Sequence, residues 1–259
     1  MFIPISDENP TLHTPIMTWL ILGAMFAVWL VVQGAGLDSR TLAASVCNLG
    51  MVPGELTHRA RLGEYVPIGP RLACVVDRDA INILTPITSM FLHGSWAHIL
   101  GNAVFFWVFG NNIEDSMGPI RFLAFYLLCG LIAAATHVLM SPASPVPTVG
   151  ASGAISGILG AYLVLYPRVR VNILFFFVIF FRVFAVPAWI VLILWFALQV
   201  LTSLPTLSPL PDVNGGVAVW AHIGGFVAGV LLIKVFENPR LVAERNTSRQ
   251  RGFSAAPSL

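Results

Sequence analysis

The chain has 259 residues, of which 57% are hydrophobic and only 10% are charged, and its formal net charge at pH 7 is +2. Its mean hydropathy is +0.83. Because soluble domains carry about 25% charged residues, this composition excludes an ordinary soluble domain and favours a membrane protein.

A helix needs about 20 mostly apolar residues to cross the roughly 30 Å hydrocarbon core of a bilayer. The first apolar stretch, 14–33, is too long for the core of a signal peptide, and no basic residue precedes it. We therefore expect it to remain in the mature protein as a helix. The aromatic run at 172–181 is expected at the membrane interface. Six stretches are expected as helices: 14–33, 96–110 (with a start as early as 87 left open), 119–139, 150–166, 186–201 and 217–236.

These stretches predict an all-α polytopic membrane protein, a bundle of six transmembrane helices with a long first outer loop. We expect a short cytoplasmic tail at 1–13, one membrane domain at 14–236 and a basic cytoplasmic tail at 237–259. The basic tail is most simply a topology signal, with binding to anionic lipid left open.

Lysine and arginine favour the cytoplasmic side of a membrane protein. If both termini are cytoplasmic, nine such residues lie inside and five lie outside, which favours this orientation. The inner residues are Arg121, Arg168, Arg170, Arg182, Lys234, Arg240, Arg245, Arg249 and Arg251. The outer residues are Arg40, Arg59, Arg61, Arg71 and Arg78.

Polar residues gather near the start of the second, fourth and sixth predicted spans. These spans run in the same direction, so their first residues share one depth in the membrane. His98 and Asn102 lie in the second span, Ser152 opens the fourth, and His222 lies in the sixth. Because polar side chains within spans are costly, they are candidates for function.

This set favours nucleophilic chemistry. A serine hydroxyl becomes an effective nucleophile when an imidazole takes its proton, so Ser152 is the candidate catalytic nucleophile and His222 the candidate base. The oxyanion that forms needs N–H donors. The candidate oxyanion donors are the Asn102 amide, the His98 ring and the Ser152 backbone N–H, which precedes the helical hydrogen-bond ladder.

A carboxylate that would complete a triad is hard to place. Asp212 precedes His222 by ten residues, about 15 Å along a helix, and Glu114 lies sixteen residues beyond His98, about 24 Å. A Ser-His dyad is therefore favoured over a triad.

Small residues recur at four-residue spacing on the two helices that carry the serine and the base. Gly153, Gly157 and Ala161 follow Ser152, and Gly225 and Gly229 follow His222. Small residues let helix backbones approach closely, so these two helices are expected to pack tightly.

Together, these residues resemble the motifs of the rhomboid intramembrane serine proteases. The resemblance covers about residues 80–235 and rests on GASG at 150–153, HGSWAHILGN at 93–102 and AHIGG at 221–225. It implies Ser152 as nucleophile, His222 as general base, and His98, Asn102 and the Ser152 amide as oxyanion stabilisers. It also implies substrates that are single-span membrane proteins, cut in or near their transmembrane segment beside a small residue.

The sequence departs from the family pattern in two places. Many relatives have an aromatic residue that packs on the base histidine four places after the serine, where this chain has Ser156. Trp220 or Phe226 is then a candidate to orient His222. The Trp-Arg pair that relatives often carry in the first outer loop is absent between residues 34 and 85.

Two other classes compete with a protease: an inactive relative that binds or escorts membrane proteins, and a small transporter. Inactive relatives lose the serine or the base, which this chain has. A transporter is expected to show broken helices around ionisable residues at the midplane, whereas the polar set here lies toward one face.

The expected setting is a bacterial inner membrane, because the loops are short and no targeting segment is evident. The expected partners are the lipid bilayer and membrane-protein substrates, and the sequence leaves the substrate and the oligomeric state open. The histidines lack metal-ligand spacing and no phosphate-binding loop follows a strand. We therefore expect no metal, no cofactor and no nucleic-acid partner.

Cys47 and Cys74 fall in the long outer loop and form a candidate disulfide, because the expected compartment is oxidising. Two unpaired thiols are the alternative, since spacing does not reveal whether the Cα atoms lie within about 7 Å. Cys129 lies in a predicted span and is expected to stay reduced.

Overall fold

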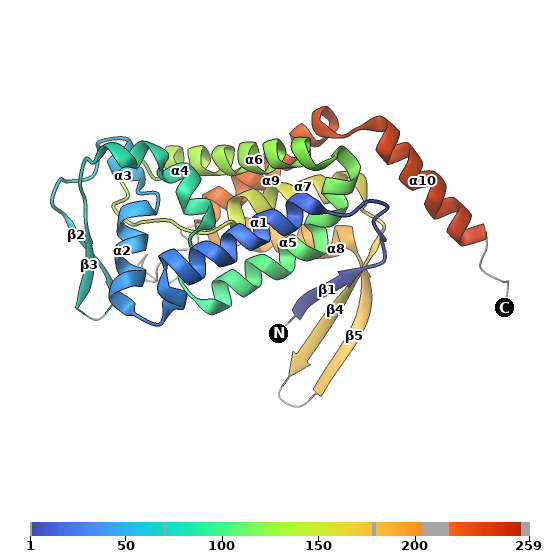
Figure 1. Cartoon of the computed structure of the whole chain (residues 1–259), viewed down its shortest axis with the longest axis horizontal. Coiled ribbons are helices and arrows are strands. Elements are labelled where there is room, and N and C mark those ends of the chain that lie inside the picture. The colour runs from blue at the N-terminus through green and yellow to red at the C-terminus, as the bar shows by residue number, and fades with distance from the viewer. Residues whose placement is uncertain (1, 70, 178–179, 204–217, 255–259) are drawn as a thin grey trace.

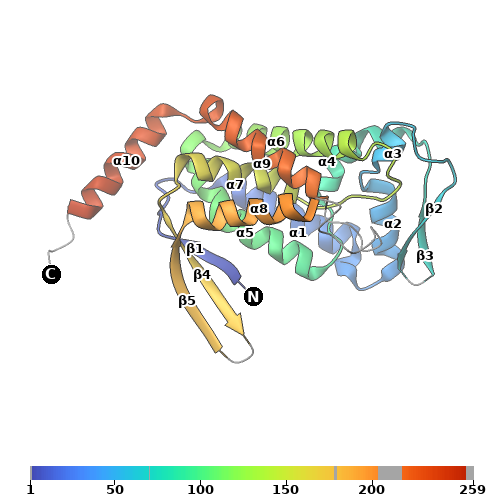
Figure 2. The same ribbon diagram turned by 180° about the vertical axis from the view of Figure 1, so that it is seen from behind.

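A computed structural model describes residues 2–69, 71–177, 180–203 and 218–254 of the chain. Six long helices run side by side along the longest dimension of the molecule (Figures 1 and 2). They are α1 (Ile16–Ala27), α5 (Trp96–Met117), α6 (Pro119–Met140), α7 (Ser152–Leu165), α8 (Ala188–Ser203) and α9 (Val219–Phe236).

Each of these helices coincides with one of the six predicted stretches, and α1 continues into a π-helical turn, η1 (Val28–Val32). By length and hydropathy, two helices in the described part of the chain, α6 and α9, could cross a membrane. Four further apolar helical stretches are shorter: Ile16–Val32, Ala80–Phe91, Ser152–Leu165 and Ala188–Leu201.

Further helical elements lie between and beyond these six helices. The α-helices among them are α2 (Ser39–Leu49), α3 (Pro53–Leu56), α4 (Thr85–Thr88) and the C-terminal α10 (Pro239–Ser254). The 3-10 turns are η2 (Gly34–Gly36), η3 (Ala80–Leu84) and η4 (Ser89–Phe91).

The centre of the bundle is α7, which contacts α5, α6, α8 and α9. Every residue from Ala154 to Tyr162 is buried, so this helix presents no continuous outward face over that length. Its mixture of glycine, alanine and larger apolar residues suits a helix that other helices surround.

The tightest contact joins α7 to α9. A Cβ atom placed on Gly225 would collide with the carbonyl oxygen of Gly153, and one placed on Gly229 would collide with that of Gly157. Only glycine permits this approach of one backbone to the other. The close packing predicted from the four-residue spacing of small residues is therefore confirmed.

The structure also contains two small antiparallel sheets, so the expectation of an all-α protein is corrected. One sheet has the order β1-β4-β5 and the other pairs β2 with β3. The described residues of the aromatic run at 172–181, expected at the interface, lie in two paired antiparallel strands, because aromatic and β-branched residues favour strands. The strands are β1 (Phe2–Asp7), β2 (Tyr65–Gly69), β3 (Leu72–Val75), β4 (Arg170–Phe177) and β5 (Phe180–Pro187).

The three-stranded sheet projects from one end of the bundle, and α10 extends from the same end (Figures 1 and 2). A buried ionic cluster ties both to the helices. Arg245 of α10 pairs with Asp115 at 3.1 Å. Asp7 of β1 accepts hydrogen bonds from Tyr162 and Asn112. Burial raises the pKa of Asp7 to about 6 despite these bonds and the nearby Arg245 charge. Both terminal segments are thus packed against the bundle.

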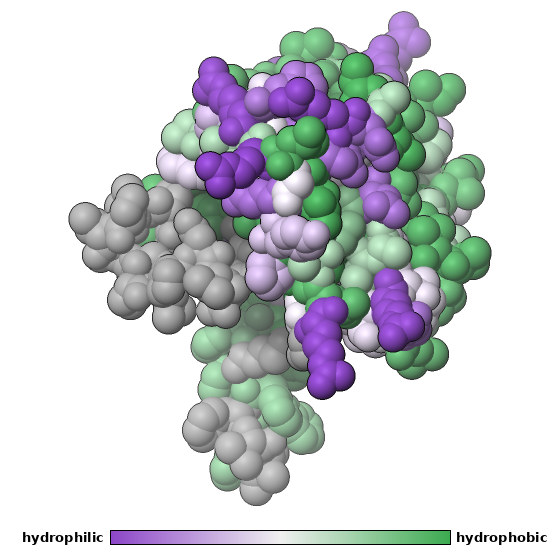
Figure 3. Space-filling view, turned by 90° about the vertical axis from the view of Figure 1, so that its left-hand side faces the viewer, coloured by the Kyte–Doolittle hydropathy of each residue, from purple (hydrophilic) through white to green (hydrophobic). Residues whose placement is uncertain are grey.

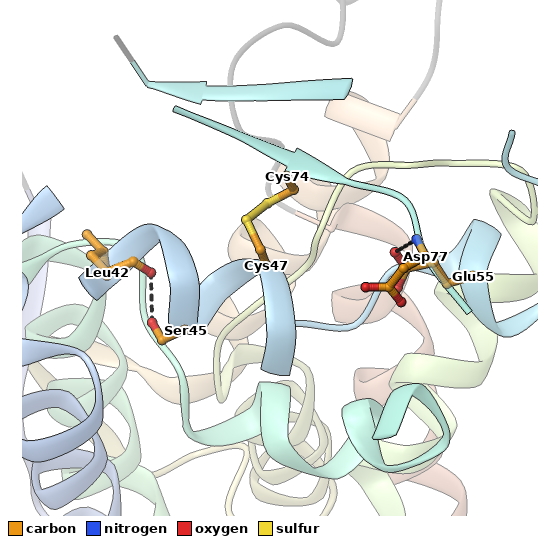
Figure 4. The surroundings of a disulfide bond; sticks show 6 residues. All are labelled: Leu42, Ser45, Cys47, Glu55, Cys74 and Asp77. Atoms are coloured by element: carbon orange, nitrogen blue, oxygen red, sulfur yellow. Dashed lines mark hydrogen bonds between the residues drawn. A yellow bond between two sulfur atoms is a disulfide. The ribbon is translucent and has the colours of Figure 1, made fainter. Parts of the chain in front are cut away.

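At the opposite end of the bundle, the long loop between α1 and α5 forms a cap built from α2, α3 and the β2-β3 hairpin (Figure 1). Hydrophilic side chains concentrate on this end face and hydrophobic ones along its flank (Figure 3). A disulfide joins Cys47 of α2 to Cys74 of β3, with 5.2 Å between their Cα atoms (Figure 4). Cys129 is a free, buried thiol.

The space around each glycine predicts different effects for two glycine substitutions. Gly229→Ala forces a methyl group against the Gly157 carbonyl, whereas Gly23 has nothing within 4 Å of an added Cβ. Overpacking costs about 1–3 kcal/mol, so Gly229→Ala should lower the thermal unfolding midpoint in detergent by about 4 °C or more. Gly23→Ala, the matched control on α1, should leave the midpoint unchanged or raise it. A Gly229→Ala variant as stable as the unmodified protein would contradict the close approach.

Removal of the disulfide is expected to loosen the cap without unfolding the bundle. The bridge spans a sequence separation of 27 residues, and a closed loop of that size contributes roughly 3 to 4 kcal/mol against local unfolding. The Cys47→Ser, Cys74→Ser double variant should be cut faster within residues 48–73 by limited proteolysis. Reductant should accelerate cleavage of the unmodified protein and have no effect on the variant. Complete alkylation of both thiols in the native protein without reductant would disprove the bridge.

Candidate active site

Ser152 is the first residue of α7, so its backbone N–H precedes the hydrogen-bond ladder of that helix. The loop before it is held by a hydrogen bond from Gly150 N–H to the Ser89 carbonyl, 2.8 Å, and by a β-bridge between Met51 and Thr148. Gly150 has a φ of +126°, which a residue with a side chain rarely adopts. A glycine is therefore required where the loop turns into α7.

His222 lies in the first turn of α9, and its ring reaches the serine across the helix contact. The Nε2 atom is 2.7 Å from Ser152 Oγ, within hydrogen-bond distance. The imidazole is only 8% exposed. The close approach of the two backbones thus brings together the two residues that the sequence pairs as nucleophile and base.

His98 and Asn102 approach the same site from α5. The Ser95 hydroxyl caps this helix by accepting a hydrogen bond from His98 N–H, 3.2 Å, which puts His98 in the first turn. Asn102 follows one turn later on the same face. A Cβ atom placed on Gly150 would lie 2.7 Å from His98 Nε2 and 3.6 Å from Asn102 Nδ2. Both side chains therefore border the loop two residues before the serine.

Both side chains have a nitrogen suited to donate a hydrogen bond. His98 Nδ1 accepts a hydrogen bond from Gly94 N–H at 3.4 Å, which leaves Nε2 as the N–H donor of the neutral ring. Asn102 Nδ2 is buried and has no hydrogen-bond partner among the residues that the structure describes. An unpaired buried donor is uncommon, and here it lies beside the loop that leads to Ser152.

Two further residues contact the His222 ring, and both come from α8. Gln199 Oε1 is 2.8 Å from His222 Nδ1. The Trp195 ring centroid is 5.8 Å from the His222 ring centroid at an interplanar angle of 40°. Neither residue was predicted from the sequence. The candidates were polar residues near the start of the second, fourth and sixth predicted spans, and α8 corresponds to the fifth.

A signal for Gln199 is nevertheless present in the sequence. The predicted span at 186–201 runs in the opposite direction, so its last turns reach the depth at which the other spans begin. Gln199 is the polar side chain in those last turns. Its depth in the predicted span therefore indicates a place beside the other polar residues, whichever way the helix runs.

Of the two carboxylates considered for a triad, Glu114 lies away from the site. Glu114 accepts hydrogen bonds from the backbone N–H groups of Met17 and Thr18, 2.8 and 2.7 Å, at the start of α1. Asp212 lies outside the described residues.

The aromatic contact to the base also differs from expectation. Within the described ranges, the ring contact to His222 comes from Trp195 rather than from Trp220 or Phe226. Phe226 packs instead on α8, stacked on Phe196 at a centroid distance of 4.4 Å. Residue 156 is a serine where the family pattern has an aromatic residue, and the ring contact to His222 is made instead by Trp195 of α8.

This arrangement has the components of nucleophilic catalysis at a carbonyl group. It joins a serine hydroxyl to an imidazole that can take its proton, and it sets N–H donors nearby for a developing oxyanion. Among the described residues, no group of three or more His, Cys, Asp or Glu side chains could hold a metal ion.

Comparison with known proteins identifies one family. A family model for the Rhomboid domain matches residues 82–238. The chain is 41% identical over 81 residues to Rhomboid protease GluP of Bacillus subtilis, covering 31% of this chain and 15% of the relative. It is 31% identical over 149 residues to Rhomboid-like protease 5 of Toxoplasma gondii, covering 56% and 15%. It is 29% identical over 166 residues to RHOMBOID-like protein 5 of Arabidopsis thaliana, covering 60% and 53%.

The matched segments thus span from 15% to 53% of these relatives' lengths. Two of the three names contain the word protease, and the third does not.

Proposed function

The chain belongs to the rhomboid family, and from that premise we propose that it is an intramembrane serine endopeptidase with a Ser-His dyad. Ser152 is the nucleophile and His222 is the general base. The observation that carries the proposal is the 2.7 Å contact between His222 Nε2 and Ser152 Oγ. Such a contact lowers the cost of removing the serine proton during attack.

The proposed reaction proceeds by acyl transfer. Ser152 Oγ attacks the carbonyl carbon of the scissile peptide bond while its proton passes to His222 Nε2, so a C–O bond forms and the carbonyl oxygen takes the negative charge. The N–H groups of His98, Asn102 and Ser152 donate to that oxygen.

Collapse of this intermediate breaks the C–N bond, and His222 gives its proton to the departing amine. A water molecule then attacks the acyl group and passes a proton to His222, which returns it to Ser152 Oγ. The second product leaves with a new carboxyl group, and the enzyme is restored.

Hydrolysis requires water within an apolar bundle, and the short length of α7 supports its access. The helix has 14 residues, about 21 Å at 1.5 Å per residue, which is less than the roughly 30 Å of hydrocarbon. As part of the proposal, Ser152, at its first residue, lies below the membrane surface at a depth that water can reach.

Family membership makes the chain a polytopic membrane protein. As part of the proposal, the six long helices span the bilayer, the cap of α2, α3, β2 and β3 is the outer loop, and both termini are cytoplasmic. The hydrophilic end face of that cap supports this seating (Figure 3). We further propose a bacterial inner membrane and single-span membrane proteins as substrates, cut in or near their transmembrane segment.

Removal of either member of the dyad should abolish activity. Ser152→Ala and His222→Ala should each lower cleavage of a single-span test substrate in liposomes by about 10³-fold or more, and the double variant should be no slower, because one catalytic unit is non-additive. Both should also lose labelling by a fluorophosphonate probe while they keep the thermal unfolding midpoint of the unmodified protein. Substantial cleavage by Ser152→Ala would overturn the assignment. An unmodified protein that is neither labelled nor active would indicate an inactive relative.

Asn102→Ala should slow catalysis without ending it. Loss of one oxyanion donor costs about 2.7 to 4 kcal/mol, so kcat should fall by about 100- to 1000-fold while KM changes little. Leu100→Ala is the matched control, because Leu100 lies on the same helix and is 48% exposed. If both variants keep kcat within about twofold of the unmodified protein, Asn102 has only a packing role.

A further inference from the structure

We propose that Gln199 is a positioning residue that holds His222 in the tautomer required of a general base. This inference rests on the proposed function, because it concerns how the base of that same site is prepared. It identifies a third side chain, from a third helix, on which the Ser-His dyad depends.

The two ring nitrogens of His222 have different partners. Nδ1 is 2.8 Å from Gln199 Oε1, and Nε2 is 2.7 Å from Ser152 Oγ. An amide oxygen accepts hydrogen bonds and does not donate them, so Nδ1 must carry the proton in this contact. Nε2 of the neutral ring is then left with its lone pair directed at the serine hydroxyl.

This tautomer is the one that general-base catalysis requires. If the proton were on Nε2, the ring would donate to Ser152 Oγ and could not accept its proton. The hydrogen bond made by one ring nitrogen sets the state of the other, so Gln199 determines whether His222 is ready to act.

A second residue of α8 contacts the same ring. Trp195 precedes Gln199 by one helical turn, so both project from the same side of α8. Trp195 contacts the His222 ring and, at a centroid distance of 6.2 Å, the Phe226 ring of α9. The imidazole is thus contacted at Nδ1 by Gln199 and by the tilted ring of Trp195.

The central helix α7 does not supply this support. Residue 156, one turn after the nucleophile, is a serine whose hydroxyl donates to the Ser152 carbonyl at 2.6 Å. It is fully buried and offers no ring for the imidazole to pack against. Among the described residues, the contacts to the His222 ring other than that of Ser152 come from α8.

A neutral amide suits this position for an electrostatic reason. A carboxylate within the apolar bundle would carry a large desolvation cost unless it were paired. The amide of Gln199 accepts the Nδ1 hydrogen bond without introducing a charge. The histidine can therefore be held in one tautomer at a small cost in stability.

Three variants test this role. Gln199→Leu keeps the approximate volume but removes the acceptor, and Gln199→Glu keeps an acceptor at the same place. Leu194→Ala is the control, because Leu194 lies on α8 and is 60% exposed.

Gln199→Leu should lower kcat by about 10- to 100-fold with KM nearly unchanged. This loss is part of the roughly 10²- to 10⁴-fold rate enhancement that a positioned general base contributes. Gln199→Glu should keep kcat within about threefold of the unmodified protein, with the acid limb of its pH–activity profile displaced to higher pH, because a carboxylate favours the imidazolium. Leu194→Ala should match the unmodified protein in both respects.

Several outcomes would overturn the role of Gln199. Gln199→Leu with unchanged kcat would show that the contact is dispensable. Gln199→Glu as slow as Gln199→Leu would show that the Gln199 amide is needed as a hydrogen-bond donor to Nδ1. The proton of the neutral ring would then be on Nε2, which is the opposite tautomer.

Nitrogen-15 NMR of histidine-labelled protein provides a readout that does not depend on proteolysis. The His222 signals, assigned by their loss in His222→Ala, should show a protonated Nδ1 and an unprotonated Nε2, and the Gln199→Leu variant should lose this preference. A protonated Nε2 in the unmodified protein would overturn the inference even if the protein is an active protease. Conversely, the expected tautomer in a protein without protease activity would uphold the positioning role and reject the proposed function.

Discussion

The candidate site depends on the contact between α7 and α9, where each backbone lies against the other. At Gly225 and Gly229 there is no room for a Cβ atom, because the carbonyl oxygens of Gly153 and Gly157 occupy that space. Lipid chains are as apolar as the helices, so the hydrophobic effect does not drive this association, and close packing of small residues does. The same approach sets His222 and Ser152 at hydrogen-bond distance.

Around that contact, the polar residues of the site come from four helices. Ser152 lies on α7, His222 on α9, Gln199 on α8, and His98 and Asn102 on α5. All of these side chains are uncharged when the histidines are neutral. A network of neutral donors and acceptors costs less to bury in an apolar bundle than a network with an unpaired ion. The bundle can therefore hold a reactive constellation without a charged pair at its centre.

The charged and covalent ties of the structure lie at the two ends of the bundle. At one end the disulfide between Cys47 and Cys74 holds the cap together. At the other, Arg245 and Asp115 join the C-terminal helix to α5. This distribution separates two tasks. Glycine packing holds the helices of the site, and a disulfide and an ion pair hold the two ends.

The sequence alone determined much of this protein, because membrane helices require long apolar stretches and expose each polar residue within them as an exception. Six helices, the Ser152–His222 pairing and the close approach of two glycine-bearing helices could all be inferred from such patterns. The strands β1, β4 and β5 could not, since a short run of aromatic and β-branched residues fits an interfacial segment as well as a hairpin. Gln199 and Trp195 were likewise beyond the pattern, because their role depends on which face of α8 turns toward α9. Only the tertiary structure decides that rotation, since helix propensity and hydropathy are the same for every orientation of an apolar helix about its own axis.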